Sequence, residues 1–339
     1  MNHAWISDAP RLELGFLPTP LVPLERLSAR LGGPRLWLKR DDCTGLATGG
    51  NKTRKLEYLL ADAIRQQADA IVTFGAVQSN HARQTAAACA AAGMPCHLVL
   101  ARKVPWPHPH YDTSGNVLLD RLLGADVQVV APDAFADARA ALLDRLERDG
   151  RLPYVIPVGG SSHVGAMGYA RCAMELMEQS RALEFALTDV VHASSSAGTQ
   201  AGLLAGFAGL VLDGDGTAPR VHGINVSEVD PTVLPKDVQR LVGEVIAERG
   251  LDAAVAAEDV RLDDRYLGDG YGLPTEATVA AIRLLAGTEG VLLDPVYSGK
   301  AFAALVDRIE RGEFAGVDDV VFIHTGGTAS LAVYDTAFI

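Results

Sequence analysis

Residues 45–57 read GLATGGNKTRKLE and place a lysine, Lys52, in the first turn of a predicted helix. Gly49 and Gly50 precede it, and glycine permits backbone conformations and close approaches that a side chain would block. Backbone amides at a helix start attract anions, and apolar residues recur at helical spacing from Leu56 onward. The pattern therefore predicts that Lys52 lies where a helix meets a cavity.

Three interpretations of Lys52 compete. A phosphate-binding P-loop reads G-x-x-x-x-G-K-[ST]. Gly45 and Gly50 have that spacing, but Asn51 is inserted before Lys52, which turns the lysine by about 100° around the helix axis. In the second interpretation, a lysine amine deprotonated by desolvation bonds covalently to the aldehyde of pyridoxal 5′-phosphate. In the third, the lysine belongs to a basic surface turn. The other motifs of the sequence have to distinguish between these three interpretations.

Length, composition and charge indicate an ordinary globular protein. With 339 residues, the chain exceeds what one hydrophobic core usually serves, so about two domains are expected. The net charge of −12 opposes nonspecific binding to nucleic acid or to anionic membranes. The sequence has neither a basic N-terminal region followed by an apolar run nor a window long and apolar enough to span a membrane. We therefore expect no nucleic-acid partner, no membrane partner and a cytoplasmic location.

The four cysteines form neither a CxxC pair nor a Cys/His spacing suited to zinc. A protein of this size does not need disulfides to hold its core together. We therefore expect reduced thiols and no bound metal.

Short apolar segments alternate with helical patterns along the chain. The predicted strands are residues 36–40, 70–75, 97–101, 127–131, 154–160, 190–194, 221–226 and 320–327. Such alternation implies parallel sheets with helices on both faces, that is, an α/β fold. Because ligands collect at the carboxyl ends of parallel strands, we expect the site in the turns that follow these strands.

Two of these turns carry small polar residues before a helix. Ser79 and Asn80 follow the strand at 70–75; helix capping would explain both, or they contribute polar groups to a site. The neighbouring His81 is a candidate base, but we favour a role in bonding the backbone, because a Schiff-base lysine already supplies a proton acceptor. Residues 194–202, SSSAGTQAG, form either a structural turn or an anion-binding nest at a helix start.

Two later segments, DPVYSGK at 294–300 and HTGG at 324–327, again combine small polar residues with strand ends. Tyr297 and Tyr271 are candidates to stack on a planar ligand or to donate protons to it. The alternative is that each is a half-buried tyrosine that bonds the backbone.

In combination, these motifs resemble a known family. The segments KRDDCTGLATGGNKTRKLE, GAVQSNHARQTAA, VIPVGGSSHVGAMGY, SSSAGTQAG, DPVYSGK and HTGG are similar to the D-cysteine desulfhydrase and 1-aminocyclopropane-1-carboxylate deaminase family, in order over residues 10–335. This family is a branch of the tryptophan synthase β-like enzymes of fold type II, which use pyridoxal 5′-phosphate. The resemblance implies a homodimer whose large domain comprises residues 1–54 and 166–339, with a small domain inserted at residues 55–165.

The resemblance also implies roles for individual residues. Lys52 would bond to the cofactor, Asn80 would bond its phenolic oxygen, and Ser79 would contact the substrate carboxylate or assist proton transfer. The cofactor phosphate would be held by Lys55, Ser196, Ala197, Gly198 and Thr199. Tyr297 would lie against the pyridine ring with Tyr271 nearby, and either Ser298 or Thr325 would face the pyridine nitrogen.

The expected reaction is β-elimination on a small amino acid. Deaminase members carry a glutamate directly after the tyrosine that matches Tyr297, whereas this chain has Ser298, which disfavours cyclopropane opening. We expect D-cysteine to give pyruvate, hydrogen sulfide and ammonia. The alternatives are an L-cysteate sulfo-lyase, to which CTGLATGGNKT and QSNHARQTAA are also similar, the deaminase itself, or a noncatalytic carrier of the cofactor with the same fold.

Overall fold

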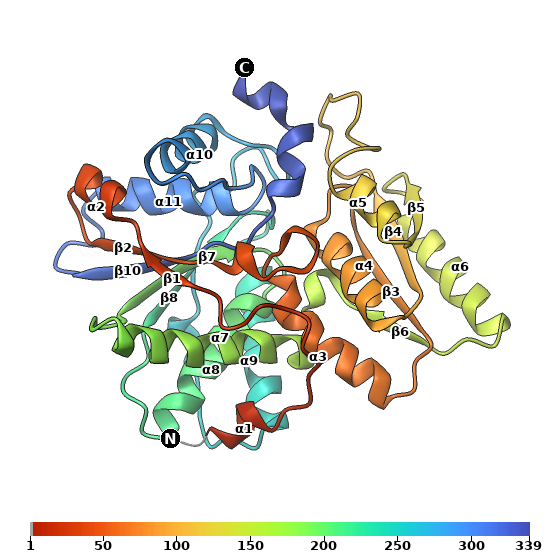
Figure 1. The fold of residues 1–339 in the computed structure, drawn as a ribbon, viewed down its shortest axis with the longest axis horizontal. Helices are drawn as coiled ribbons and strands as arrows, with labels where there is room; N and C mark the ends of the chain where they lie inside the picture. Colours follow the sequence, from red (N-terminus) through yellow and green to blue (C-terminus); the bar gives the residue numbers. More distant parts are fainter. Residues whose placement is uncertain (1–2) are drawn as a thin grey trace.

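Apolar segments of the chain form the strands of two separate sheets, which lie side by side in the computed structural model of residues 3–339 (Figure 1). The larger sheet has the order β1 (Leu21–Pro23), β2 (Arg35–Lys39), β10 (Asp319–Ile323), β7 (Asp189–Ser194), β8 (Arg220–Asn225) and β9 (Arg261–Asp263). Only β1 runs antiparallel to its neighbour. The central strands β7 and β10 are buried along their whole length, as expected for parallel strands covered on both faces.

The smaller sheet is entirely parallel. Its order is β5 (Asp126–Val130), β4 (Cys96–Ala101), β3 (Ala70–Ala76) and β6 (Pro153–Ile156). A strand is present at each of the eight predicted places, but those predicted at 154–160 and 320–327 end at Ile156 and Ile323. The α/β class with parallel sheets flanked by helices is confirmed. The strands β1 and β9 were not predicted, because three residues are too few to show a periodic pattern.

Helices cover both faces of each sheet (Figure 1). One face of the larger sheet packs on α7 (His163–Ala182), α8 (Gly198–Leu212) and α9 (Val233–Glu248), with α1 (Ala4–Ser7) beside them. The other face packs on α2 (Glu25–Leu31), α10 (Glu276–Glu289) and α11 (Ser298–Glu310). The smaller sheet lies between α6 (Phe135–Arg148) on one face and α3 (Lys52–Arg65), α4 (Asn80–Ala92) and α5 (Asn116–Leu122) on the other.

Short 3-10 helices shape the connections between these elements. They are η1 (Asp41–Cys43), η2 (Leu46–Thr48), η3 (Val158–Gly160), η4 (Ala257–Asp259), η5 (Thr328–Val333) and η6 (Asp335–Phe338). The predicted domain boundaries near residues 55 and 165 fall inside α3 and α7, two helices that pack against each other. The division into domains stays a prediction. Between residues 3 and 339, none of the helices combines the length and apolar character that a bilayer span needs.

A fully buried ionic network fixes α3 to the larger sheet. Arg54 of α3 donates to both carboxylate oxygens of Asp41, at 2.9 and 2.8 Å, and to both oxygens of Glu175 on α7, at 2.9 and 2.8 Å. Lys39 donates to Glu175 at 2.9 Å, and the Tyr169 hydroxyl donates to Asp41 at 2.6 Å. Burial by itself would raise the pKa of Asp41, but the charge and hydrogen bonds of Arg54 outweigh it and lower that pKa. The network therefore stays ionised.

We expect Arg54→Met to lower the free energy of unfolding by about 3–5 kcal/mol, because it leaves Asp41 and Glu175 buried without their main counter-charge. Urea unfolding at neutral pH measures this. Arg65→Met on the same helix is the matched control: its exposed guanidinium pairs only with Asp62, so we expect a change within about 0.5 kcal/mol. Equal urea midpoints for the two variants would contradict the importance of the network.

Candidate active site

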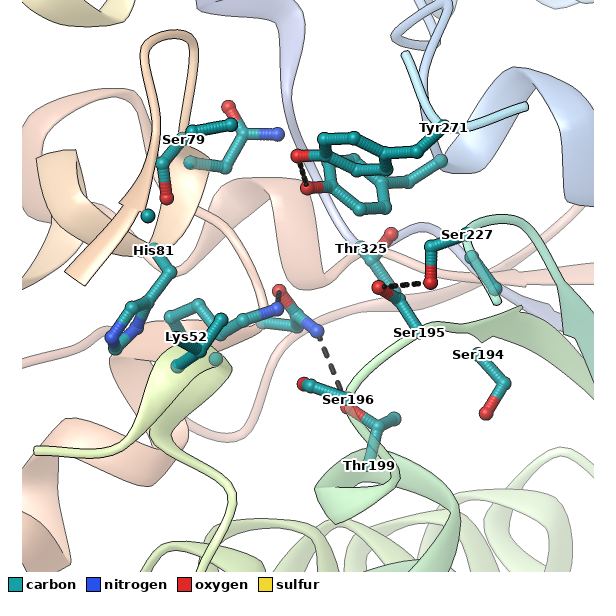
Figure 2. Close-up of a pocket in the computed structure, with 18 of the residues that line it drawn as sticks. Lys52, Ser79, His81, Ser194, Ser195, Ser196, Thr199, Ser227, Tyr271 and Thr325 are labelled. Atoms are coloured by element: carbon teal, nitrogen blue, oxygen red, sulfur yellow. Dashed lines mark hydrogen bonds between the residues drawn. The ribbon is translucent and has the colours of Figure 1, made fainter. Parts of the chain in front are cut away.

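A cavity of about 370 Å³ opens at the carboxyl ends of strands from both sheets. Figure 2 shows Ser79 and His81 on one side, the serines 194–196 with Thr199 on the opposite side, and Lys52 between them. Of the residues predicted from the sequence, the following line this cavity: Lys52, Ser79, Asn80, Ser196, Ala197, Thr199, Tyr271, Tyr297 and Thr325. Residues remote in the sequence therefore meet at one site, as the strand-end rule predicts.

The turn before Lys52 requires glycine. Gly49 and Gly50 have φ values of +71° and +133°, which side chains disfavour. A Cβ on Gly50 would lie 2.5 Å from the side-chain nitrogen of Gln84, and one on Gly49 would clash with the backbone oxygen of Asp42. The close turn brings Lys52 to the start of α3 at the cavity wall, as predicted.

Burial changes the acid–base chemistry of Lys52. Desolvation lowers the pKa of its ammonium to about 8, with a further contribution from Arg83 and an opposing one from Asp294. At pH 7 about a tenth of the amine is then neutral, compared with less than about a thousandth for a lysine of ordinary pKa. Lys52 Nζ donates a hydrogen bond of 3.0 Å to Asn51 Oδ1. The amine is suited to nucleophilic addition and to accepting a proton.

The start of α8 forms an anion cradle with Lys55. This helix of 15 residues begins at Gly198, directly after the serine turn, so its N-terminal amides and dipole face the cavity. Lys55 Nζ donates to the Gly159 carbonyl at 3.1 Å, and a Cβ on Gly198 would lie only 2.9 Å from Lys55 Nζ. Burial, with Lys52 nearby, lowers the pKa of Lys55 well below its ordinary value, so a bound anion would stabilise its charged form. Lys55 and Gly198 thus stand directly behind the lining residues, where the cradle fits a phosphate group.

Asn80 is held in a defined orientation at the start of α4. Its Oδ1 accepts a hydrogen bond of 3.0 Å from Asn116 Nδ2, so the amide nitrogen is directed elsewhere, and that nitrogen lies near Gly327. An Asn80 fixed in this way presents an N–H donor, as bonding to a phenolic oxygen requires. Ser79 caps α4, because its Oγ accepts from the Ala82 amide at 3.1 Å, yet it also lines the cavity. Capping and a place in the site are therefore compatible.

His81 lines the cavity with a fixed tautomer. Its Nε2 lies 2.8 Å from Thr73 Oγ1, whose hydroxyl donates to the Ile156 carbonyl at 2.8 Å. Thr73 can therefore only accept, which places the ring proton on Nε2 and leaves Nδ1 as an acceptor. Burial, with smaller contributions from Lys52 and Lys55, lowers the pKa of His81 well below its ordinary value, so the ring is neutral. Its partner is thus a threonine hydroxyl, whereas the sequence favoured a bond to the backbone.

Tyr271, which is labelled in Figure 2, forms a hydrogen-bonded pair with Tyr297, and both tyrosines line the cavity. Their hydroxyl oxygens lie 2.5 Å apart, and their ring centroids are 5.9 Å apart with planes at 61°. Burial raises the pKa of both phenols, and that of Tyr297 is raised further by Tyr271 and Asp294. Both are therefore neutral hydroxyl groups at physiological pH and can donate a hydrogen bond or a proton.

The structure distinguishes the two candidates for the pyridine nitrogen. Thr325 follows β10 and lines the cavity, whereas Ser298 is fully buried behind Tyr297. Ser298 Oγ donates to Asp294 Oδ1 at 2.6 Å and accepts from the Asp294 amide at 2.8 Å. Thr325 is thus the hydroxyl that faces the cavity.

Several lining residues were not predicted. Ser227 and Glu228 follow β8, Lys103 follows β4, and Phe135 begins α6. The rule that sites gather at strand ends would have found the first three, because each lies within two residues of the end of a predicted strand. The Ser227 hydroxyl donates to Ser195 Oγ at 2.8 Å, which joins the turns after β7 and β8.

Comparison with known proteins shows to which enzymes the chain is similar. The profile of the family described as "Pyridoxal-phosphate dependent enzyme" matches residues 12–326. A 1-aminocyclopropane-1-carboxylate deaminase of Burkholderia vietnamiensis and a D-cysteine desulfhydrase of Salmonella typhi are each 45% identical to the chain over 335 residues, which is 97% of each protein compared. A crystal structure of an ACC deaminase homologue superposes with a TM-score of 0.87 at 38% identity, covering 99% of this chain and 97% of the other.

The lowered pKa of Lys52 predicts how fast the protein takes up its cofactor. Only the neutral amine adds to an aldehyde, so the rate at which protein stripped of cofactor binds pyridoxal 5′-phosphate covalently should rise about tenfold per pH unit up to pH 8, then level off. Stopped-flow absorbance measures the rate. Lys52→Ala should give no covalent product after borohydride reduction. A rate that keeps rising to pH 10 would show an ordinary lysine.

The cradle predicts that Gly198→Ala weakens binding of the cofactor phosphate by about tenfold, because the new Cβ would displace Lys55 Nζ and Ser161 Oγ. Pyridoxamine 5′-phosphate is the appropriate probe, since it carries the phosphate but cannot bond to Lys52. Gly287→Ala in α10 is the matched control: its Cβ would meet open space, so affinity should not change. Equal affinities for the two variants would exclude Gly198 from the phosphate site.

Proposed function

The chain belongs to the family of pyridoxal-phosphate-dependent enzymes, and from this premise we propose that it is a lyase that catalyses β-elimination on D-cysteine, giving pyruvate, hydrogen sulfide and ammonia. The observation that carries the choice of reaction is Ser298, a neutral hydroxyl committed to Asp294. It stands directly after Tyr297, at the position where the family resemblance implies a glutamate in the deaminases. A relative named D-cysteine desulfhydrase is 45% identical to the chain, but a relative named deaminase is equally similar, so the choice between the two reactions rests on Ser298.

The cavity residues fit the cofactor, and each has a role that follows from its chemistry. Lys52 would bond to the cofactor and, once released, accept the proton from the substrate Cα through its neutral Nζ. When bound, the cofactor supplies a conjugated ring that stabilises negative charge at this carbon. Lys55 and the loop of residues 196–199 would hold the phosphate, with the Gly198 amide bonded to the Ser196 carbonyl at 2.8 Å and thereby shaping the loop. Asn80 would donate to the phenolic oxygen.

The substrate would be oriented by the opposite wall. Ser79 would bind its carboxylate at the start of α4, where the helix dipole favours an anion. The hydroxyl pair of Tyr271 and Tyr297 would lie over the reacting carbons; one hydroxyl donates to the other, and the remaining proton would be donated to the leaving sulfur. Thr325, which cannot protonate the pyridine nitrogen, would keep the ring a moderate electron sink. Such a ring is sufficient where the leaving group departs promptly.

Release of sulfite from L-cysteate is a second candidate, favoured by Lys103. This cation lines the cavity at the end of β4, and an ammonium near the leaving group would stabilise a sulfonate. Glu228, on the turn after β8, also lines the cavity and opposes an additional negative charge. The balance between these two charges favours the smaller, less charged substrate D-cysteine.

We further propose that the enzyme is a homodimer that works in the cytoplasm and closes its small domain, residues 55–165, over the substrate. The resemblance to the family supports the dimer, and the four free cysteines, one of them exposed, are suited to a reducing compartment. Sedimentation equilibrium tests the dimer: a mass near the 35.8 kDa of one chain would exclude it.

The test of function is a panel of four substrates, D-cysteine, L-cysteine, L-cysteate and 1-aminocyclopropane-1-carboxylate, with sulfide, sulfite and keto acid followed in parallel. We expect sulfide and pyruvate in equal amounts from D-cysteine, and a loss of at least about a thousandfold in Lys52→Ala. Sulfite from L-cysteate as the main product would favour the second candidate. Keto acid from the cyclopropane substrate, together with no sulfide from either cysteine and no sulfite from L-cysteate, would refute β-elimination. Inertness toward all four substrates would favour a noncatalytic carrier.

A further inference from the structure

Lys300 is a fully buried lysine outside the cavity lining that has an unusual set of partners. Its Nζ donates to two backbone carbonyls, those of Leu267 at 2.6 Å and Gly270 at 2.8 Å. Among residues 3–339, no carboxylate lies within ion-pair distance of this amine. A buried ammonium without an ion pair is costly, so its position calls for a reason.

Lys300 is connected to both tyrosines of the pair, to Tyr297 through its own helix and to Tyr271 through the carbonyl that it binds. Lys300 lies in the first turn of α11, which begins immediately after Tyr297. Gly270, one of its acceptors, immediately precedes Tyr271. A single ammonium therefore ties together the two backbone segments whose side chains meet through hydroxyls 2.5 Å apart.

The segment that carries Tyr271 is rich in glycine, although Tyr271 and Leu273 pack against the hydrophobic core. Gly268, Gly270 and Gly272 all have positive φ values, 66°, 131° and 78°, and glycine loses more conformational freedom on ordering than any other residue. On the far side of Tyr271, the Tyr334 hydroxyl donates to the Gly272 carbonyl at 2.8 Å. Lys300 is the corresponding anchor on the near side.

We propose that Lys300 is a positioning residue that holds Tyr271 in contact with Tyr297 and thereby sets the hydroxyl pair over the substrate. The ammonium form makes the stronger donor. Burial lowers the pKa of Lys300 to about 8, while Asp294 and Asp269 oppose that shift, so the charged form still predominates at pH 7. The effect on turnover rests on the proposed function, whereas the effect on the loop does not.

A double-mutant cycle between Lys300 and Tyr271 tests the proposal in the holoenzyme, with sulfide release from D-cysteine as the readout. Lys300→Met should lower kcat about tenfold in the wild-type background and less than about twofold in a Tyr271→Phe background, because a lysine that acts through the Tyr271 hydroxyl has nothing left to position. The KM should change less than kcat. Equal losses in the two backgrounds would overturn the proposal.

Lys39→Met is the matched control. Lys39 is also fully buried and also donates to a backbone carbonyl, that of Thr19, but it does not contact the loop of Tyr271. It should lower stability and should reduce kcat by the same factor in both backgrounds. Coupling of Lys39 to Tyr271 as strong as that of Lys300 would show a general effect of removing buried lysines.

Hydrogen exchange provides a readout that does not depend on turnover. The amide of Leu273, which donates to the Gly270 carbonyl at 3.4 Å, should exchange at least about tenfold faster in Lys300→Met and at an unchanged rate in Lys39→Met. Unchanged exchange in Lys300→Met would overturn the proposal even if the enzyme turns over D-cysteine. A wild-type enzyme inert to D-cysteine would refute the proposed function, and exchange alone would then decide the role of Lys300. If Lys300→Met does not fold, Lys300→Gln, whose side-chain amide keeps N–H donors but loses the positive charge, takes its place.

Discussion

The desolvation of cationic side chains at the start of α3 is the constraint on which the site depends. Four consecutive residues, 52–55, send three cations in different directions: Lys52 into the cavity, Arg54 into the ionic network and Lys55 to the anion cradle. All three are removed from water, yet only Arg54 meets carboxylates. Its guanidinium therefore stays charged and fixes the helix, while burial lowers the pKa of both lysines. One helix turn thus combines an anchor with reactive amines.

The contrast between Arg54, which meets carboxylates, and Lys52 and Lys55, which do not, explains why the fold tolerates the two unpaired lysines. An unpaired buried ammonium destabilises a fold, and a lysine whose pKa is lowered well below its ordinary value, as that of Lys55 is, can lose the proton and thereby reduce the cost. The network of Arg54 with Asp41 and Glu175 fixes the helix start independently of the cavity, so Lys52 and Lys55 need no carboxylate of their own. A phosphate-bearing aldehyde supplies what each lacks, a covalent partner for Lys52 and an anion for Lys55. The protein and its cofactor are therefore complementary in charge at this end of the cavity.

The sequence predicted what depends on continuous patterns and missed what depends on orientation. Buried parallel strands are unbroken apolar runs, so they were found, and the turns after them located the cavity. The direction of a hydroxyl cannot be read from a motif. Ser298 and Thr325 were equivalent candidates until the structure showed that Asp294, four residues earlier, bonds the Ser298 hydroxyl. The tautomer of His81 likewise depends on Thr73 and on the carbonyl of Ile156, which lies on a neighbouring strand.

The surroundings of Asp294 also bear on which reaction the site supports, since relatives with different names are equally similar to this chain. The Asp294 carboxylate accepts from the amides of Val296, Tyr297 and Ser298 and from the Ser298 hydroxyl. A glutamate at position 298 would remove that hydroxyl donor and bring a second carboxylate beside the first, in a buried place where like charges repel strongly. The turn would have to rearrange together with Tyr297 to accept it. A neutral residue at position 298 is therefore built into the packing of this turn, and a reaction without an acidic partner for the ring is the one that this packing favours.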